Sequence, residues 1–155
     1  MRGWLISAAV LALSGSAQAH EVKAGALTLS GLAVRASLGA VPTSAAYLTI
    51  ANAGAAPDRL LSVDCACAQM AMMHQSRIVK GVASMDMVDS VVIPAHGKAV
   101  FSPTGLHIML TGLTGPLKAG GLQPMALHFE HAGAVKAGFH VRDVIAAADK
   151  AGTKP

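Results

Sequence analysis

The stretch from Leu106 to Leu110 constrains the fold more than any other part of the chain. It reads Leu-His-Ile-Met-Leu, so branched aliphatic residues alternate with His107 and Met109. Alternation with a period of two is typical of a strand that has one face in the core and the other face outside it. We therefore expect Leu106, Ile108 and Leu110 to face the core, and His107 and Met109 to share the outer face.

Similar short runs recur along the rest of the chain. Runs rich in Val, Ile, Leu and Thr are separated by Gly, Pro, Asn and Asp, which favours short strands joined by tight turns. Many such strands in one chain predict an all-β fold built as a sandwich of two packed sheets. The expected strands are residues 27–38, 46–51, 58–63, 70–79, 90–93, 98–101, 106–110, 125–130 and 137–141.

The N-terminal residues have the features of a secretory signal peptide. Arg2 precedes a short apolar run, and the Ala-Gln-Ala sequence at positions 17–19 fits a cleavage site. We therefore expect a signal peptide over residues 1–19, one β-sandwich domain over residues 20–142, and a short flexible tail over residues 143–155. The signal has no cysteine at its end for a lipid anchor, and no later stretch is long enough for a membrane helix. We expect a periplasmic protein without stable membrane insertion.

Charge and motifs argue against nucleic-acid binding and catalysis. The formal net charge is +4 for the whole chain, and it becomes +3 when Arg2 leaves with the signal peptide. The remaining basic residues are scattered, so a nucleic-acid surface has no support. The chain has no Gly-rich phosphate loop, no G-x-S-x-G motif and no paired carboxylates near His107. We expect a monomeric binding protein and not an enzyme.

Methionine and histidine are concentrated in one part of the chain. Five of the eight methionines lie between Met70 and Met87, which is dense for a residue that usually serves as scattered core filler. Thioether sulfur is a soft ligand and imidazole is a borderline one, so together they suit Cu(I) better than the oxygen-preferring Mg, Ca or Mn. Met109 on the outer face of a strand gains little from burial, which favours a ligand role over packing.

The spacing of these residues resembles that of the PCuAC family of periplasmic copper chaperones. The family signature is a His, ten residues, a Met, twenty-one residues, a His, one residue and a Met, and His74, Met85, His107 and Met109 match it in full. The resemblance extends over about residues 25–142. It implies a cupredoxin-like Greek-key β-sandwich in which these four residues bind one Cu(I). It also implies delivery of copper to the copper subunit of cytochrome c oxidase, with Sco-type thiol proteins as a second class of partner.

Such a site suggests transfer by ligand exchange. Neutral thioethers and imidazoles bind Cu(I) softly, and a shallow site would let a Cys or His of an acceptor displace them. Met72, Met73 and Met87 are expected to line the mouth of the site, either as transient ligands or as a hydrophobic rim for docking.

Two further features leave alternatives open. Cys65 and Cys67 are separated by one residue, and they are interpreted as a labile disulfide, as free thiols, as a second copper or transfer site, or as simple core packing. His20 would follow the cleavage site, where its free α-amino group and imidazole would suit Cu(II). The alternative for His20 is a solvated terminus.

Three rival function classes also remain open. A copper-buffering or resistance protein would use the same site as a chaperone. A cupredoxin-type electron carrier would need a Cys thiolate beside two His ligands. A purely structural β-sandwich would bind no copper.

Overall fold

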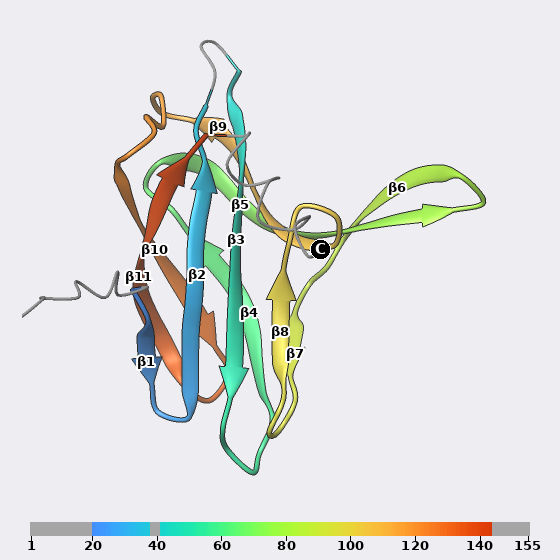
Figure 1. Cartoon of the computed structure of the whole chain (residues 1–155), viewed down its shortest axis with the longest axis vertical. Helices are drawn as coiled ribbons and strands as arrows, with labels where there is room; N and C mark the ends of the chain where they lie inside the picture. Colours follow the sequence, from blue (N-terminus) through green and yellow to red (C-terminus); the bar gives the residue numbers. More distant parts are fainter. Residues whose placement is uncertain (1–19, 38–40, 144–155) are drawn as a thin grey trace, which may run out of the picture.

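The computed structural model describes residues 20–37 and 41–143 and is all-β over them (Figure 1). The expected signal peptide and all but the first residue of the expected tail lie outside the described residues. Within the described ranges there is no helix of the length and hydrophobicity needed to cross a membrane. The strands are β1 (Val22–Ala24), β2 (Leu27–Arg35), β3 (Thr43–Asn52), β4 (Asp58–Asp64), β5 (Ala68–Val79), β6 (Val82–Met87), β7 (Val91–Ile93), β8 (Lys98–Phe101), β9 (Leu106–Leu113), β10 (Leu122–Phe129) and β11 (Gly133–Arg142).

These strands form a continuous sheet that folds over itself into two layers. Their order is β6-β5-β9-β8-β3-β2-β11-β10-β4-β7, with β1 on β2 and a further pairing between β9 and β3. In Figure 1, β2 and β3 lie in front of β4 and β10. The hairpin of β10 and β11 connects the two layers, because β11 also pairs in parallel with β2.

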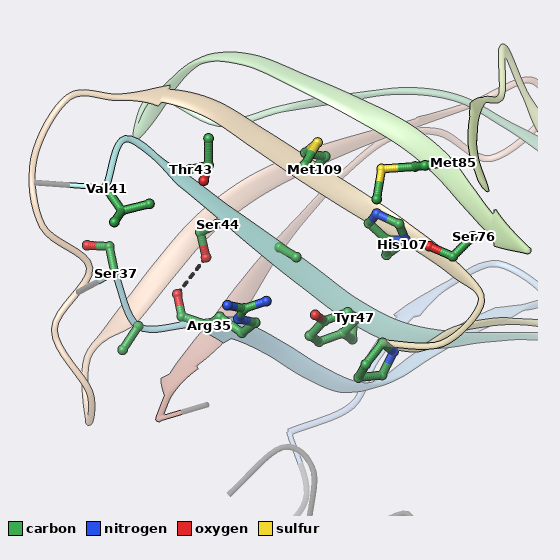
Figure 2. Close-up of a pocket in the computed structure, with 13 residues that line it drawn as sticks. Arg35, Ser37, Val41, Thr43, Ser44, Tyr47, Ser76, Met85, His107 and Met109 are labelled. Atoms are coloured by element: carbon green, nitrogen blue, oxygen red, sulfur yellow. Dashed lines mark hydrogen bonds between the residues drawn. The ribbon is translucent and has the colours of Figure 1, made fainter. Parts of the chain in front are cut away.

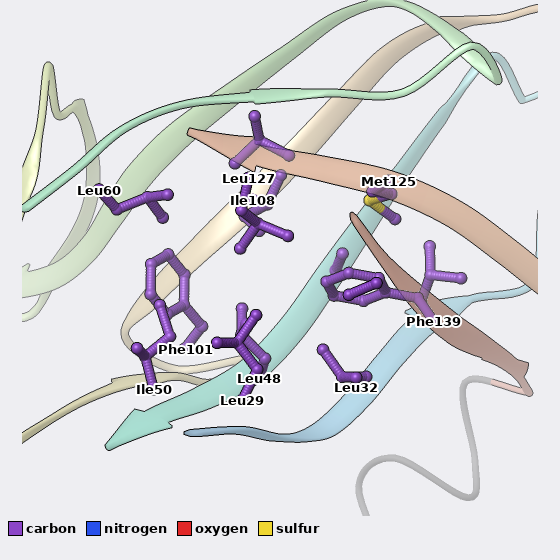
Figure 3. Close-up of a cluster of buried hydrophobic side chains, with 14 of the residues drawn as sticks. Leu29, Leu32, Leu48, Ile50, Leu60, Phe101, Ile108, Met125, Leu127 and Phe139 are labelled. Carbon is purple, nitrogen blue, oxygen red and sulfur yellow. The ribbon is translucent and has the colours of Figure 1, made fainter. Parts of the chain in front are cut away.

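Alternate residues of these strands fill the space between the layers. Figure 3 shows Leu60 of β4 and Leu127 of β10 on one side of the core, with Leu29 and Leu48 on the other. All four, and Phe139 of β11, are 0–2% exposed. Burying each such side chain contributes roughly 1.5–3 kcal/mol relative to leaving it in water. This burial fixes which residues of each strand point outward.

Two strands were not expected from the sequence. β1 has only three residues, too few for its alternation to mark a strand, and β6 has all six of its residues exposed. Other differences concern strand ends: β2 stops at Arg35, and β3 begins at Thr43 and not at Ala46.

The hairpin of β5 and β6 forms an arm that extends away from the sandwich (Figure 1). Its turn places Lys80 and Gly81 at φ values of 52° and 77°. Two successive residues with positive φ are typical of a tight hairpin turn, and glycine adopts that conformation without steric cost. The arm brings β6 beside β5 even though no core residue holds it there.

Asp58 at the start of β4 fixes the turn between β10 and β11. Its carboxylate accepts hydrogen bonds from the backbone N–H groups of Arg59, His131 and Ala132, at 2.7, 3.0 and 3.0 Å. Burial alone would raise the pKa of Asp58, but these hydrogen bonds, with the nearby His131, lower it below the usual 3.8. The folded state therefore favours the ionised carboxylate.

We expect replacement of Asp58 by Asn to lower the free energy of unfolding at neutral pH by about 1–3 kcal/mol, because three partly buried N–H groups lose their charged acceptor. Since the folded pKa is lowered, the stabilisation by Asp58 is present above pH 3.8 and is lost as the pH falls through the lower folded value. Urea unfolding of both proteins from pH 7 to pH 2 tests this. The stability difference should shrink at the acid end, and a difference that stays constant would contradict the account.

Candidate metal centre

Strand register brings the sequence-predicted ligands onto one face of three adjacent strands. His74 on β5, the central strand, lies directly opposite His107 of β9 on one side and Met87 of β6 on the other. Met72 lies opposite Met109. Directly opposite residues of an antiparallel pair share a face of the sheet. All five side chains therefore belong to the same face.

The predicted alternation of β9 is confirmed, with one correction. Ile108 and Leu110 are 0% exposed, and Leu106 packs against the same core. His107 points away from this core as expected, yet it is only 5% exposed. Its ring meets the ring of His74 edge-on, with centroids 5.9 Å apart and planes at 68°. The outer face of β9 is thus covered at His107 and is not open to solvent there.

The orientation of the His107 ring is set by its own strand. Its Nδ1 lies 3.0 Å from the carbonyl oxygen of Gly105. Because a carbonyl oxygen only accepts, Nδ1 carries the proton and donates it, which leaves the lone pair on Nε2. A backbone partner on the other ring nitrogen is the arrangement that orients metal-binding histidines.

His74 carries a buried nitrogen that has no protein partner. Its Nδ1 is buried and makes no hydrogen bond to any residue within 20–37 and 41–143. A buried polar atom without a partner costs about 1–3 kcal/mol. Coordination of a metal would satisfy a ring nitrogen of His74, so this histidine fits a ligand role.

The two methionines of the predicted set lie at the open side of the His107 ring. Figure 2 shows Met85 from β6 and Met109 from β9 beside His107. These three residues and Ser76, which lies opposite Met85 on β5, line one cavity of about 260 Å³. Met85 is 51% exposed. His74 does not line this cavity, and its ring contacts that of His107. The site therefore opens to solvent through its methionines.

The donor atoms of this face are soft and neutral. No group of three or more His, Cys, Asp or Glu side chains able to hold a metal occurs in the described part of the chain. A four-ligand site on this face must therefore use methionine sulfur. Two imidazoles and two thioethers suit Cu(I), whereas Zn(II) prefers nitrogen, oxygen and thiolate donors.

The expectation that Met73 lines the mouth of the site is wrong. Met73 is 5% exposed and lies opposite Ile108, within the hydrophobic core. Neighbouring strand residues point to opposite faces of a sheet. Because Met72 and His74 lie on the outer face, Met73 between them points into the core. Met72 is half-buried and Met87 is 65% exposed, and both lie on the face of the site.

Cys65 and Cys67 are bonded to each other and lie away from this face. They form a disulfide in the loop before β5, and each is 9% exposed against the core. The six residue steps of β5 from Ala68 to His74 span about 20 Å. Neither cysteine can therefore reach a metal at His74. Of the interpretations of this pair, the disulfide and the core packing are present and the free thiols are not.

His20 is also remote from His107. It lies beside His140 of β11, with ring centroids 5.2 Å apart. From β11 to β9 the strand order is β11-β2-β3-β9, and three strand spacings amount to about 14 Å. Sequence reasoning assigned no role to His140, because only the fold brings it to His20.

Comparisons with known proteins agree with this fold. A family model described as "Putative lipoprotein LpqE-like" matches residues 27–141. No curated protein matches the chain. The structure of the copper-bound PCuAC domain from PmoF2 is similar with a TM-score of 0.69 and 24% identity, covering 80% of this chain and 98% of that one.

Two solution structures of DR1885 from Deinococcus radiodurans are also similar, each with a TM-score of 0.63. The apo form is 27% identical and covers 94% of this chain and 98% of that one. The Cu(I) form is 28% identical, with coverages of 82% and 83%. The predicted cupredoxin-like Greek-key β-sandwich is confirmed by these matches.

Proposed function

This chain belongs to the LpqE-like family, and we propose that it is an extracytoplasmic protein that binds Cu(I) and passes it on by ligand exchange. The observation that carries the proposal is the strand register, which aligns His74 with His107 and sets Met109 and Met85 beside them. The similar structures described as copper-bound and as a Cu(I) form support the choice of metal. We take the protein to be located in the periplasm, to which a signal peptide over residues 1–19 would direct it.

The residues act as four ligands of unequal accessibility. His107 and His74 form the inner side, where burial and the Gly105 carbonyl hold the His107 ring in place. Met109 and the exposed Met85 form the outer side. An acceptor ligand would displace the thioethers first, because they face the opening and hold Cu(I) without charge. The copper would then leave toward the acceptor while the protein keeps its fold.

We propose the copper subunit of cytochrome c oxidase as the acceptor, with Sco-type thiol proteins as a second class of partner. A copper-buffering or resistance protein is the alternative, since it would use the same four ligands. Mixing the Cu(I)-loaded protein with the copper-free oxidase subunit separates the two functions. A chaperone should metallate the subunit, whereas a buffering protein should retain its copper.

A cupredoxin-type electron carrier is a weaker alternative. A blue-copper centre needs a Cys thiolate among its ligands, and Cys65 and Cys67 form a disulfide outside the site. The optical spectrum after copper addition and oxidation tests this alternative. An intense blue colour would favour the electron carrier over the proposed function.

We expect one Cu(I) to bind tightly per chain, with Zn(II) binding much more weakly, because thioethers are poor zinc ligands. Competition with a chromophoric Cu(I) chelator measures the affinity and the stoichiometry, and a parallel zinc titration gives the comparison. Equal affinity for the two metals would contradict the proposed site.

We also propose a separate Cu(II) site at His20, supported by its position beside His140. In a chain produced to begin at His20, the α-amino group and the two imidazoles are nitrogen donors that suit Cu(II). Replacing His140 with Ala should abolish a defined Cu(II) paramagnetic resonance signal and leave Cu(I) affinity at parent level. A signal that survives this change would contradict the site.

A further inference from the structure

Two arginines lie side by side on the outer face that carries the metal centre. Arg35 ends β2 and Arg142 ends β11, and they lie directly opposite each other in the parallel pairing of these strands. Both side chains are exposed. Neither forms an ion pair with any residue within 20–37 and 41–143. Like charges directly opposite each other destabilise a sheet, and an anion between them would remove that cost.

A cavity connects Arg35 of this pair to the metal centre. Figure 2 shows Arg35 and Tyr47 at one side of the 260 Å³ cavity, with Met85, His107 and Met109 at the other. The residue between the two sides is Ala45 of β3, which lies directly opposite Met109. Its small side chain leaves the space open. A group bound at Arg35 would therefore lie next to the copper ligands.

The chemistry of the cavity favours a carboxylate. Among the described residues no Asp or Glu lines it, and its polar side chains are the Arg35 guanidinium, the His107 imidazole and the hydroxyls of serine, threonine and tyrosine residues. The hydroxyl of Ser44 donates to the carbonyl oxygen of Arg35 at 2.6 Å, which holds the backbone of Arg35 beside the cavity. The guanidinium group presents a planar array of donors that matches a carboxylate.

We propose that this cavity is the docking site for an acidic segment of the protein that exchanges copper with the metal centre. This inference rests on the proposed function and names the chemistry of the partner. A carboxylate of the partner binds Arg35, with Arg142 as a second cationic contact, and a neighbouring ligand of the partner then faces Met85 and Met109. Complementary charge of this kind speeds encounter and fixes the orientation of a complex.

The test uses two synthetic peptides and the copper-free protein, so that no metal bridges them. One peptide alternates Asp with Met, and the matched peptide alternates Asn with Met. We expect the acidic peptide to bind about two- to tenfold more tightly at low salt, because each exposed ion pair contributes little singly. The preference should shrink as ionic strength rises. Fluorescence anisotropy of labelled peptides gives both affinities.

Matched variants identify the residues responsible. The Arg35→Gln/Arg142→Gln double variant should lose the preference for the acidic peptide. The Lys23→Gln/Lys136→Gln double variant removes the same charge and should keep it. Lys23 lies opposite Thr28, about 23 Å along β2 from Arg35. All four side chains are exposed, so both variants should melt as the parent does.

Equal binding of the two peptides by the parent, or an unchanged preference in the arginine variant, would overturn the docking site. Cu(I) affinity measured on the same proteins keeps this result separate from the proposed function. The arginine variant should bind Cu(I) as the parent does. A parent that prefers the acidic peptide but binds no Cu(I) would support the docking site and contradict the proposed function.

Discussion

Replacing His107 with Gln is expected to lower Cu(I) affinity by at least about 100-fold, since loss of groups that merely orient a ligand already costs about 10–100-fold. The imidazole of His107 is already buried and oriented before any metal binds. It is 5% exposed, its Nδ1 is held by the Gly105 carbonyl, and its ring meets that of His74. Glutamine keeps much of the side-chain volume but removes the imidazole. Competition with a Cu(I) chelator measures the change.

A second histidine provides the control for this experiment. His128 of β10 contacts Asp64 through its Nε2 at 2.7 Å and lies in the other layer of the sandwich. Replacing His128 with Gln should leave Cu(I) affinity unchanged. Thermal melts of both variants show whether the fold is retained. Parent-like Cu(I) affinity in a folded His107 variant would exclude His107 as a ligand.

Replacing Ile108 with Ala is expected to lower the free energy of unfolding by about 2–5 kcal/mol, because the substitution leaves a cavity in a packed core. Ile108 is 0% exposed and lies opposite Met73, which is itself buried. The neighbouring replacement of Met109 with Leu should do the reverse. It keeps an apolar side chain of similar size but removes the thioether, so Cu(I) affinity should fall at least about tenfold with little change in stability.

Urea unfolding and chelator competition on both variants distinguish a residue of β9 that stabilises the fold from a neighbouring residue that binds copper. Two results would contradict the assignment of Ile108 to the core and of Met109 to the metal-binding face. One is an Ile108→Ala variant with parent stability, and the other is a Met109→Leu variant that binds Cu(I) as tightly as the parent.

Strand β9, which carries His107 and Met109, was predictable because its residues alternate. Ile108 and Leu110 occupy the core as expected, and this places His107 and Met109 on the other face. The same rule applied to residues 72–74 would have turned Met73 inward, so its misplacement was avoidable. The burial of His107 was not predictable, because alternation tells which face a residue is on but not what covers that face.

The pairing of distant strands could not be predicted from spacing. The family signature separates His74 from His107 by many residues, and only the register of β5 with β9 shows that they lie directly opposite each other. Strand β6 gave no signal because all six of its residues are exposed, so no apolar period marks it. Its place beside β5 comes from the turn at Lys80 and Gly81 and from backbone pairing. The position of Met85 at the site is therefore a result of the structure.

The central claim is that one Cu(I) binds to His74, Met85, His107 and Met109, and copper X-ray absorption of the Cu(I)-loaded protein tests it most directly. We predict a mixed shell of two nitrogen and two sulfur neighbours, from the two imidazoles and the two thioethers of this set. The spectrum should be the same in a Cys65→Ser/Cys67→Ser double variant. A shell of nitrogen alone or of sulfur alone, or a sulfur contribution that disappears with the cysteines, would contradict the account.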